Sequence, residues 1–187
     1  MNDLRTIKTT QAIENALMEL IEIKGFSKIK LTDIASKAMV NRNTIYLHYA
    51  SKEDIVISIL NKTYKEENFG DDFFKMLFSS PNKKSIAKLM TQLVDSIDKN
   101  IELYRILTTD PNLKGYLTHI INVFRNKTLK EIEDTNSNKI RLDYMLSGTY
   151  GAVSRWVTHA EVSREEIIDE LTSITYFGLK TISKKRK

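Results

Sequence analysis

The sequence predicts an all-α protein, with a small N-terminal module followed by a larger helical region. Apolar residues recur at intervals of three and four along most of the chain, which is the spacing of one helix face. The chain has six glycines and two prolines, too few for an all-β protein with many turns. Its 187 residues, 41% hydrophobic and 28% charged, are typical of a globular protein with a sizeable core.

Composition narrows the setting of the protein without deciding its function. The chain has no cysteine, so it has no disulfide, thiolate metal site or redox thiol. It lacks an apolar run of transmembrane length, and its N-terminus lacks the apolar core of a signal peptide. We therefore expect a cytoplasmic protein with no membrane partner. The net charge of +5 is a modest bias toward polyanions that many proteins unrelated to nucleic acids share.

Two helices are predicted before residue 40. The first begins at a cap formed by Thr9 or Thr10 and ends before Gly25, because a lysine in the last turn and a glycine after it are typical of a helix C-terminus. The second covers about residues 31–38. Its first turn contains Asp33, where a carboxylate meets the positive end of the helix dipole.

A tight turn and two further helix starts follow. Met39-Val40 is the expected turn, Asn41 the N-cap of a third helix and Ser51 the N-cap of a fourth. On the third helix Ile45 and Tyr49 are four residues apart and share one stripe that can be buried. Two short helices joined by a tight turn, the second exposing polar residues, form a helix-turn-helix. The open alternative is one more antiparallel helix pair in an all-helical protein.

The segment from residue 25 to residue 55 carries a family pattern. The matching residues, in order and spacing, are Asp33-Ile34-Ala35, Arg42, Thr44, Tyr46, His48-Tyr49 and Ser51-Lys52-Glu53. The segment resembles the DNA-binding domain of the TetR family of bacterial transcription regulators. This resemblance implies a helix-turn-helix DNA-binding domain over residues 1–66, joined by a linking helix to a ligand-binding and dimerisation domain over residues 67–187. Beyond the first third of the chain the resemblance is only architectural.

Two positions depart from that family pattern. Met39 stands where the family usually has glycine. Either the turn adapts to this residue, or it keeps a left-handed conformation that costs a non-glycine residue on the order of 1–2 kcal/mol. Lys30 stands where the family usually has threonine at the start of the second helix. The cap of that helix must then come from elsewhere, and Asp33 reaching back is our expectation.

The third helix supplies the residue types that read DNA. In the major groove Arg42 can place two donors on guanine, Asn43 can pair with adenine, and Leu47 can pack on a thymine methyl. For each residue the alternative is a solvated charge or an inward-packed side chain. The expected contacts with phosphates come from the third helix, the start of the fourth and the start of the second: Thr44, Tyr46, His48, Lys52, Lys30 and Thr32.

Further helices are predicted in the larger region. Proline disfavours helix in the residue before it, so Asp110-Pro111 ends one helix. Residues 134–138 form a polar loop, and the last two helices cover about residues 139–159 and the segment after Ser163, which forms a capping box with Glu166. The expected dimer interface, unless its apolar residues bury in the chain's own core, comprises Gly148, Gly151, Ile167, Leu171 and Ile174.

The resemblance also implies a ligand cavity between the later helices. Its candidate lining is Tyr104, Tyr116, Phe124, Tyr144 and Tyr150. Aromatic residues at helical spacing are more often ordinary core, and the sequence alone does not separate the two readings.

The sequence offers no catalytic motif. His48, His119 and His159 are far apart, and neither a metal motif nor a phosphate-binding loop is present. We expect no enzyme, no metal and no cofactor. The predicted function is a DNA-binding transcriptional regulator, by family habit a repressor, that binds a near-palindromic operator as a homodimer and is released by a small-molecule effector. The alternatives are a helical interaction or coactivator protein that has lost DNA binding, and a helical enzyme.

Overall fold

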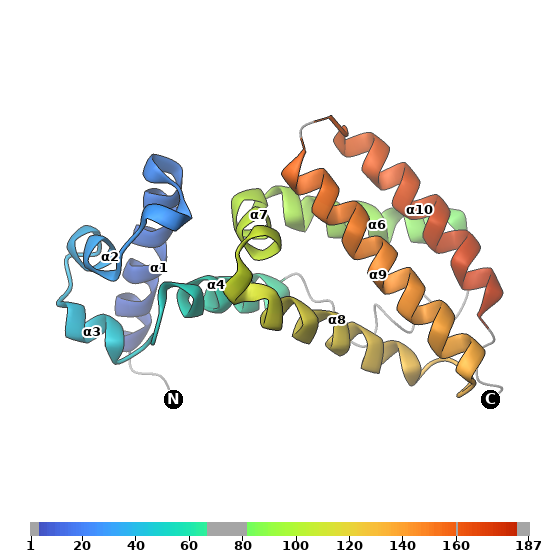
Figure 1. Cartoon of the computed structure of the whole chain (residues 1–187), viewed down its shortest axis with the longest axis horizontal. Coiled ribbons are helices and arrows are strands. Elements are labelled where there is room, and N and C mark those ends of the chain that lie inside the picture. The colour runs from blue at the N-terminus through green and yellow to red at the C-terminus, as the bar shows by residue number, and fades with distance from the viewer. Residues whose placement is uncertain (1–3, 67–81, 160, 183–187) are drawn as a thin grey trace. The chain divides into compact units, whose positions relative to one another are not determined.

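The computed structural model describes residues 4–66, 82–159 and 161–182, coloured along the chain in Figure 1. The chain divides into two compact units, Met1–Tyr64 and Lys65–Lys187, and each is described by itself. The domain boundary expected after residue 66 falls at the edge of the described ranges and stays a prediction. Within these ranges all regular structure is helical apart from one isolated bridge residue, and no helix is long and apolar enough to cross a membrane.

The first unit begins with a helix that is longer than predicted. Helix α1 spans Leu4–Lys24. The hydroxyls of Thr9 and Thr10 donate to the carbonyls of Arg5 and Ile7 at 2.8 and 3.1 Å, so they bond back into the helix and do not cap it. The predicted end is confirmed, because Gly25 follows Lys24 with a φ of 74°.

Four elements complete the first unit: a 3-10 helix η1 (Phe26–Lys28), α2 (Leu31–Lys37), α3 (Arg42–Tyr46) and α4 (Lys52–Glu66). The predicted capping residues are confirmed. The Asn41 side chain accepts from the backbone N–H of Asn43 at 2.9 Å, and the Ser51 hydroxyl accepts from that of Asp54 at 3.1 Å. Asp33 reaches back to the N–H of Lys30 at 2.8 Å. These caps fix where three short or polar segments turn into helix.

A small apolar core joins the helices of the first unit. Its fully buried side chains come from α1, α2, α3 and α4, and they are Ile13, Leu17, Ile34, Ile45, Ile55 and Val56. Since α3 has five residues, an isolated helix of its length is unstable in water. The burial of Ile45, with the cap at Asn41, is what keeps α3 in place.

The described part of the second unit contains α6 (Lys83–Asp98), α7 (Ile101–Thr109), the 3-10 helix η2 (Pro111–Leu113), α8 (Lys114–Leu129), α9 (Asn136–Thr158) and α10 (Arg164–Thr181). The break at Asp110-Pro111 and the capping box of Ser163 with Glu166 are confirmed. The polar loop is shorter than predicted. The Thr135 side chain accepts from the backbone N–H of Asn138 at 3.2 Å and caps α9, so the helix already begins at Asn136.

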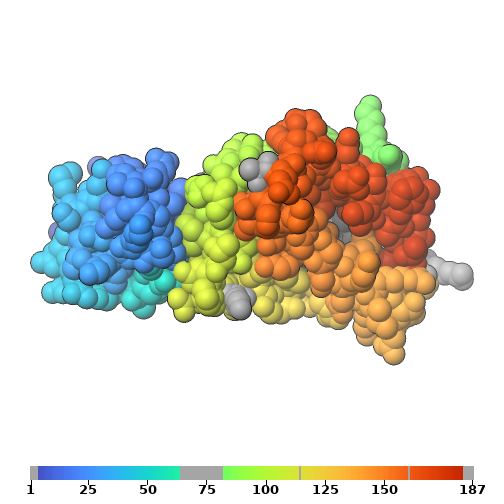
Figure 2. Space-filling model, turned by 45° about the horizontal axis from the view of Figure 1, so that its top comes forward, coloured from blue at the N-terminus to red at the C-terminus, as the bar shows by residue number. Residues whose placement is uncertain are grey.

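The core of the second unit lies mainly between α6, α9 and α10 (Figure 1). Its buried members include Leu89, Val94 and Trp156. The Met145 side chain of α9 lies over Gly178 of α10, where an added Cβ would lie 2.7 Å from the methionine sulfur. Both helices also reach the surface, where they are orange and red in Figure 2. Their outward faces are therefore available to a partner.

Candidate nucleic-acid interface

Helix α3 presents polar and apolar side chains outward while two residues hold it from behind. Ile45 is 0% exposed and Tyr49 8%, so the stripe predicted to be buried is confirmed. Arg42 and Asn43 are exposed at the N-terminus of the helix, and Leu47 is 80% exposed at its end. A short helix pinned on one face with guanidinium, amide and apolar groups on the other has the chemistry needed for the edges of base pairs.

Arg42 and Tyr46 form a pair on the exposed side of α3. The Arg42 Nε and Nη2 donate to the Tyr46 hydroxyl at 3.2 and 2.7 Å, and the guanidinium lies 5.3 Å from the centre of the tyrosine ring. One edge of the guanidinium is thus held by the hydroxyl, and its opposite edge keeps a pair of parallel N–H donors. The hydroxyl accepts both of these bonds, so its own hydrogen can still be donated to another acceptor.

Lys52 differs from its prediction as a phosphate contact. Its ammonium donates to the backbone carbonyls of Phe26 and Ile29 at 2.8 and 3.2 Å, and it lies 4.3 Å from the centre of the Phe26 ring. Carbonyls and an aromatic face satisfy the charge within the unit. Lys52 ties the start of α4 to the residues that follow α1, a tertiary contact that its position beside a helix cap did not reveal.

The remaining predicted contacts lie at or near the surface of the first unit. Lys30 and Thr32 are exposed at the start of α2, and Thr44 and His48 are half-buried on α3 and just after it. Beside Lys30, the carboxylate of Asp33 accepts from the Lys24 ammonium at 2.6 Å. This hydrogen bond, together with the backbone bond from Lys30, lowers the pKa of Asp33. The cap of α2 is therefore a carboxylate.

Of the two outcomes left open for the turn between α2 and α3, the structure has the left-handed backbone at Met39. The φ of Met39 is 53°, and within the described ranges no other non-glycine residue has a positive φ. The N–H groups of Met39 and Val40 donate to Ser36 and Ala35 at 3.2 and 3.0 Å, so the turn is hydrogen-bonded on both sides. The turn therefore has the left-handed conformation that glycine would adopt, although this conformation costs a methionine on the order of 1–2 kcal/mol.

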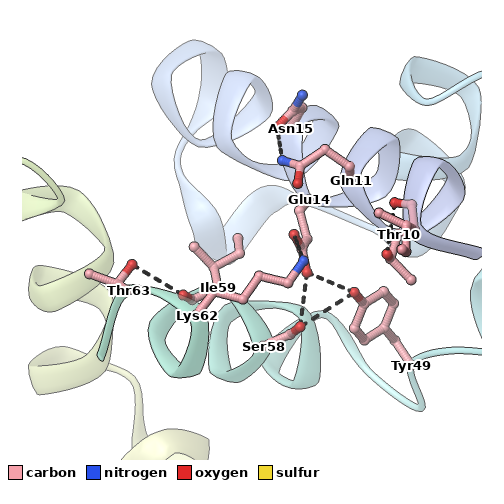
Figure 3. Close-up of polar contacts among 10 residues, drawn as sticks. Thr10, Gln11, Glu14, Asn15, Tyr49, Ser58, Ile59, Lys62 and Thr63 are labelled. Carbon is pink, nitrogen blue, oxygen red and sulfur yellow. Dashed lines mark hydrogen bonds and ion pairs between the residues drawn. The ribbon is translucent and has the colours of Figure 1, made fainter. Parts of the chain in front are cut away.

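A buried carboxylate, which sequence reasoning missed, connects α1 with the end of the motif (Figure 3). Glu14 is 3% exposed and accepts from the hydroxyls of Tyr49 and Ser58, each at 2.9 Å. The Lys62 ammonium donates to its other oxygen at 2.6 Å. The signal was present in the sequence: Glu14 lies three residues before Leu17 on the apolar stripe of α1. A carboxylate on such a stripe needs buried partners.

The Glu14 network also fixes the protonation of Tyr49. Burial raises the pKa of Tyr49 to about 12, and the hydrogen bond to Glu14 and its charge act in the same direction. The hydroxyl therefore stays protonated and donates to the carboxylate at neutral pH. Tyr49, three residues after α3 ends, is held against α1 and α4 together.

Residues 13–59 match the family model described as bacterial regulatory proteins, tetR family. This segment is a TetR-family N-terminal domain. The match includes α2, α3 and most of α4, so it covers the helix-turn-helix that the sequence predicted.

The sequence of the chain is also similar to that of a larger bacterial protein. The chain is 29% identical over 141 residues to YxbF of Bacillus subtilis (strain 168), described as an uncharacterized HTH-type transcriptional regulator. The match covers 73% of the chain but 36% of YxbF, so the chain spans about a third of that relative.

Solved TetR-like structures share the fold over nearly the whole chain. NalD, the secondary repressor of the MexAB-OprM multidrug efflux pump in Pseudomonas aeruginosa, has a TM-score of 0.67 at 19% identity and covers 94% of this chain and 98% of its own. FadR of Thermus thermophilus, a repressor solved in complex with lauroyl-CoA, has a TM-score of 0.58 at 18% identity, with 95% and 97% covered. At these identities the likeness concerns the fold.

In the second unit, the residues predicted from the TetR resemblance to line a ligand cavity do not all come together. Tyr144 is 78% exposed and lines a hollow of about 700 Å³ on the outward side of α9 and α10. Tyr104, Tyr116, Phe124 and Tyr150 do not line that hollow. Tyr116 is half-buried, and burial followed by the influence of Tyr104 raises its pKa to about 12. Of the predicted lining residues, Tyr104 and Tyr116 are both half-buried and interact electrostatically.

The predicted dimer residues divide into two groups. Gly148 and Ile174 line the hollow on α9 and α10, which we name the outer hollow, and Gly151 is exposed on α9 with open space at its Cβ position. Ile167 is 5% and Leu171 1% exposed, and both pack into the core of the unit, although Leu171 also borders the outer hollow. For Ile167 the structure corresponds to the alternative that the stripe buries in the chain itself.

Exposed apolar side chains that the sequence analysis did not assign enlarge this surface. Ile140 is 69% exposed and Phe177 63%, and both line the outer hollow with Tyr144. In the described ranges no cluster of histidine, aspartate and glutamate side chains could hold a metal ion.

Proposed function

We propose that this TetR-family chain is a DNA-binding transcriptional regulator, a repressor that binds a near-palindromic operator as a homodimer and leaves it when a small molecule binds. The observation that carries the proposal is the geometry of α3. Its buried side is fixed by Ile45 and Tyr49, while Arg42 and Asn43 stand exposed at its N-terminus. In a helix-turn-helix, the N-terminal residues of this helix contact base edges in the major groove.

Each exposed side chain of α3 has a proposed contact. Arg42 uses the free edge of its guanidinium for the O6 and N7 acceptors of guanine, and Asn43 pairs with adenine. Leu47 packs on a thymine methyl. The Tyr46 hydroxyl, which already accepts from Arg42, donates its hydrogen to a phosphate oxygen. Tyr46 then orients the arginine that contacts a base and also binds the phosphate backbone of the DNA.

Further phosphate contacts come from residues around α3. Thr44 lies on α3 and His48 just after it, while Lys30 and Thr32 stand at the start of α2, where backbone N–H groups also attract phosphates. Lys52 is not part of this set, since its donors are occupied by carbonyls.

A second copy of the chain covers the outer hollow in this proposal. Ile140, Tyr144, Ile174 and Phe177 expose apolar surface on α9 and α10. Two helices from each copy then form a four-helix interface around a twofold axis. Such a dimer contacts two half-sites about 34–36 Å apart, or a multiple of that distance.

A small-molecule effector acts through the second unit. It can release DNA only to the extent that it binds more tightly to the form of the dimer that does not fit the operator. Tyr104 and Tyr116 are the candidate contacts for it. The support by analogy is the TetR-like repressor FadR, solved in complex with lauroyl-CoA. We place the protein in the cytoplasm, with no cofactor.

Selection of bound sequences from a random pool of duplex DNA tests the proposal. We expect enrichment of a symmetric site whose half-sites contain guanine and adenine, with binding that weakens steeply as salt concentration rises. Recovery of no preferred sequence, with no salt-dependent retention on DNA, would reject it in favour of a helical interaction protein.

A further inference from the structure

Met39 combines two unusual properties. Its backbone is left-handed, with φ at 53°, a region that residues other than glycine, asparagine, aspartate and histidine rarely occupy. Its side chain is 92% exposed, more than Leu47 at 80%. The chain itself therefore gains almost no packing from this side chain, although glycine would fit the same turn without strain.

Met39 is close enough to α3 to contact a DNA duplex that binds this helix. It lies three residues before Arg42, so the two Cα atoms are at most about 11 Å apart. The turn is fixed, because the N–H of Met39 donates to Ser36 and the N–H of Val40 to Ala35. A duplex that meets Arg42 and Asn43 therefore lies within reach of a methionine side chain projecting from this turn.

The chemistry of methionine limits what it can recognise there. The side chain has no charge and no strong donor or acceptor, so it does not bind a phosphate. It is unbranched and polarisable, and it adapts to irregular apolar surfaces. In the major groove the apolar feature that distinguishes one base pair from the others is the C5-methyl group of thymine.

We propose that Met39 is a further specificity-determining residue, which packs on the methyl group of a thymine beside the base pairs that Arg42 and Asn43 read. This inference rests on the proposed function of the chain. It explains why an apolar side chain is kept at a strained and solvent-exposed turn, where backbone outliers persist when the site has a use for them.

Met39→Gly separates this role from a structural one, because stability and binding change in opposite directions. Glycine relieves the left-handed backbone, so the melting temperature of the full-length protein rises. Affinity for the selected operator falls about fourfold, the value for one methyl-sized apolar contact. Met39→Asn, which tolerates the same backbone, loses affinity like the glycine variant, and Met39→Leu retains most of it.

Replacing thymines of the operator one at a time by deoxyuridine removes only the methyl group and identifies the contact. We expect one position in each half-site at which this replacement weakens the wild type about fourfold and leaves Met39→Gly unchanged. Leu47→Ala is the matched control and keeps the sensitivity at that position. Wild-type affinity in Met39→Gly, or the same methyl dependence in both proteins, overturns the inference alone. Failure of the wild type to select any sequence overturns the proposed function together with it.

Discussion

The two units of the chain differ in how they treat polar groups and in what they expose. In the first unit the buried carboxylate of Glu14 has three side-chain partners, and the exposed surface of α3 carries guanidinium, amide and hydroxyl groups. In the described part of the second unit, the buried hydroxyls of Ser96 and Thr172 have no hydrogen-bond partner. The outer hollow on α9 and α10 instead exposes the apolar side chains of Ile140, Tyr144, Ile174 and Phe177.

This difference indicates two kinds of partner. A surface of oriented donors is useful against a polyanion whose acceptors are fixed in space. An apolar surface recognises through shape and area, and large exposed apolar patches mark sites of association. One chain can therefore contact DNA with one unit and another copy of itself with the other, with little overlap between the two chemistries.

The largest expected effect concerns the apolar surface. The double substitution Ile174→Asp and Phe177→Asp places four carboxylates at an interface between two copies, so we expect dimer affinity to fall more than about 100-fold, given the cost of burying unpaired charges. Sedimentation at micromolar concentration should then show monomers. Asp169→Lys, an exposed position on α10 outside the outer hollow, should leave the dimer intact. A wild type that sediments as a monomer would contradict the proposal that the apolar surface of α9 and α10 contacts a second copy.

Glu14→Leu tests the polar network of the first unit. It removes the acceptor of the buried Tyr49 hydroxyl and of the half-buried Ser58 hydroxyl and leaves the Lys62 ammonium without its carboxylate, so we expect the free energy of unfolding to fall by about 3 kcal/mol. Urea unfolding followed by circular dichroism measures this. Glu14→Gln keeps an acceptor in place and should lose less. Equal stability of the leucine variant and the wild type would mean that the network only fills space.

Arg42→Ala and Tyr46→Phe test how the first unit reads DNA. Arg42→Ala should weaken operator binding by about 1–3 kcal/mol and relax the preference at one base pair. Tyr46→Phe removes the acceptor that orients Arg42, so it should relax the preference at that same base pair. Fluorescence anisotropy on operators varied at each position measures both. A phenylalanine variant with lower affinity but unchanged base preference would limit Tyr46 to its phosphate contact.

The smallest effect is the pH dependence of the network. The pKa of Tyr49 is raised to about 12 from an ordinary value of 10.0, so the unfolded chain loses this proton first. The stabilisation is fully present below pH 10.0 and is lost as pH rises toward 12. Tyr116 behaves in the same way, so only the difference between the wild type and Tyr49→Phe isolates Tyr49. That difference should shrink across this window, and a constant difference would exclude the linkage.

Local signals made the centre of the first unit predictable. The caps at Asn41 and Ser51 and the buried pair of Ile45 and Tyr49 follow from residues within one or two turns of each other. Such features depend on side chains that meet their own backbone, so a single sequence contains them.

Contacts between distant residues were not predictable in this way. Lys52 is 26 residues from Phe26, and Glu14 is 48 from Lys62, and only the folded chain brings them together. A helical stripe also does not say whether it faces a core or a partner, which is why the buried Ile167 and the exposed Ile174 were expected at one interface. Thr9 and Thr10 show a local failure, because a hydroxyl bonds equally well to the turn before it.

The contact of Lys52 with Phe26 and Ile29 has a consequence for protein engineering. It closes the chain on itself around α2 and α3, so residues 26–52 begin and end at one point of the structure. A segment with adjoining ends can be replaced without stretching its flanks. Chimaeras that exchange residues 26–52 as one cassette between members of the family, with the phenylalanine and the lysine at its two ends, should therefore transfer DNA preference while α1 and α4 are retained.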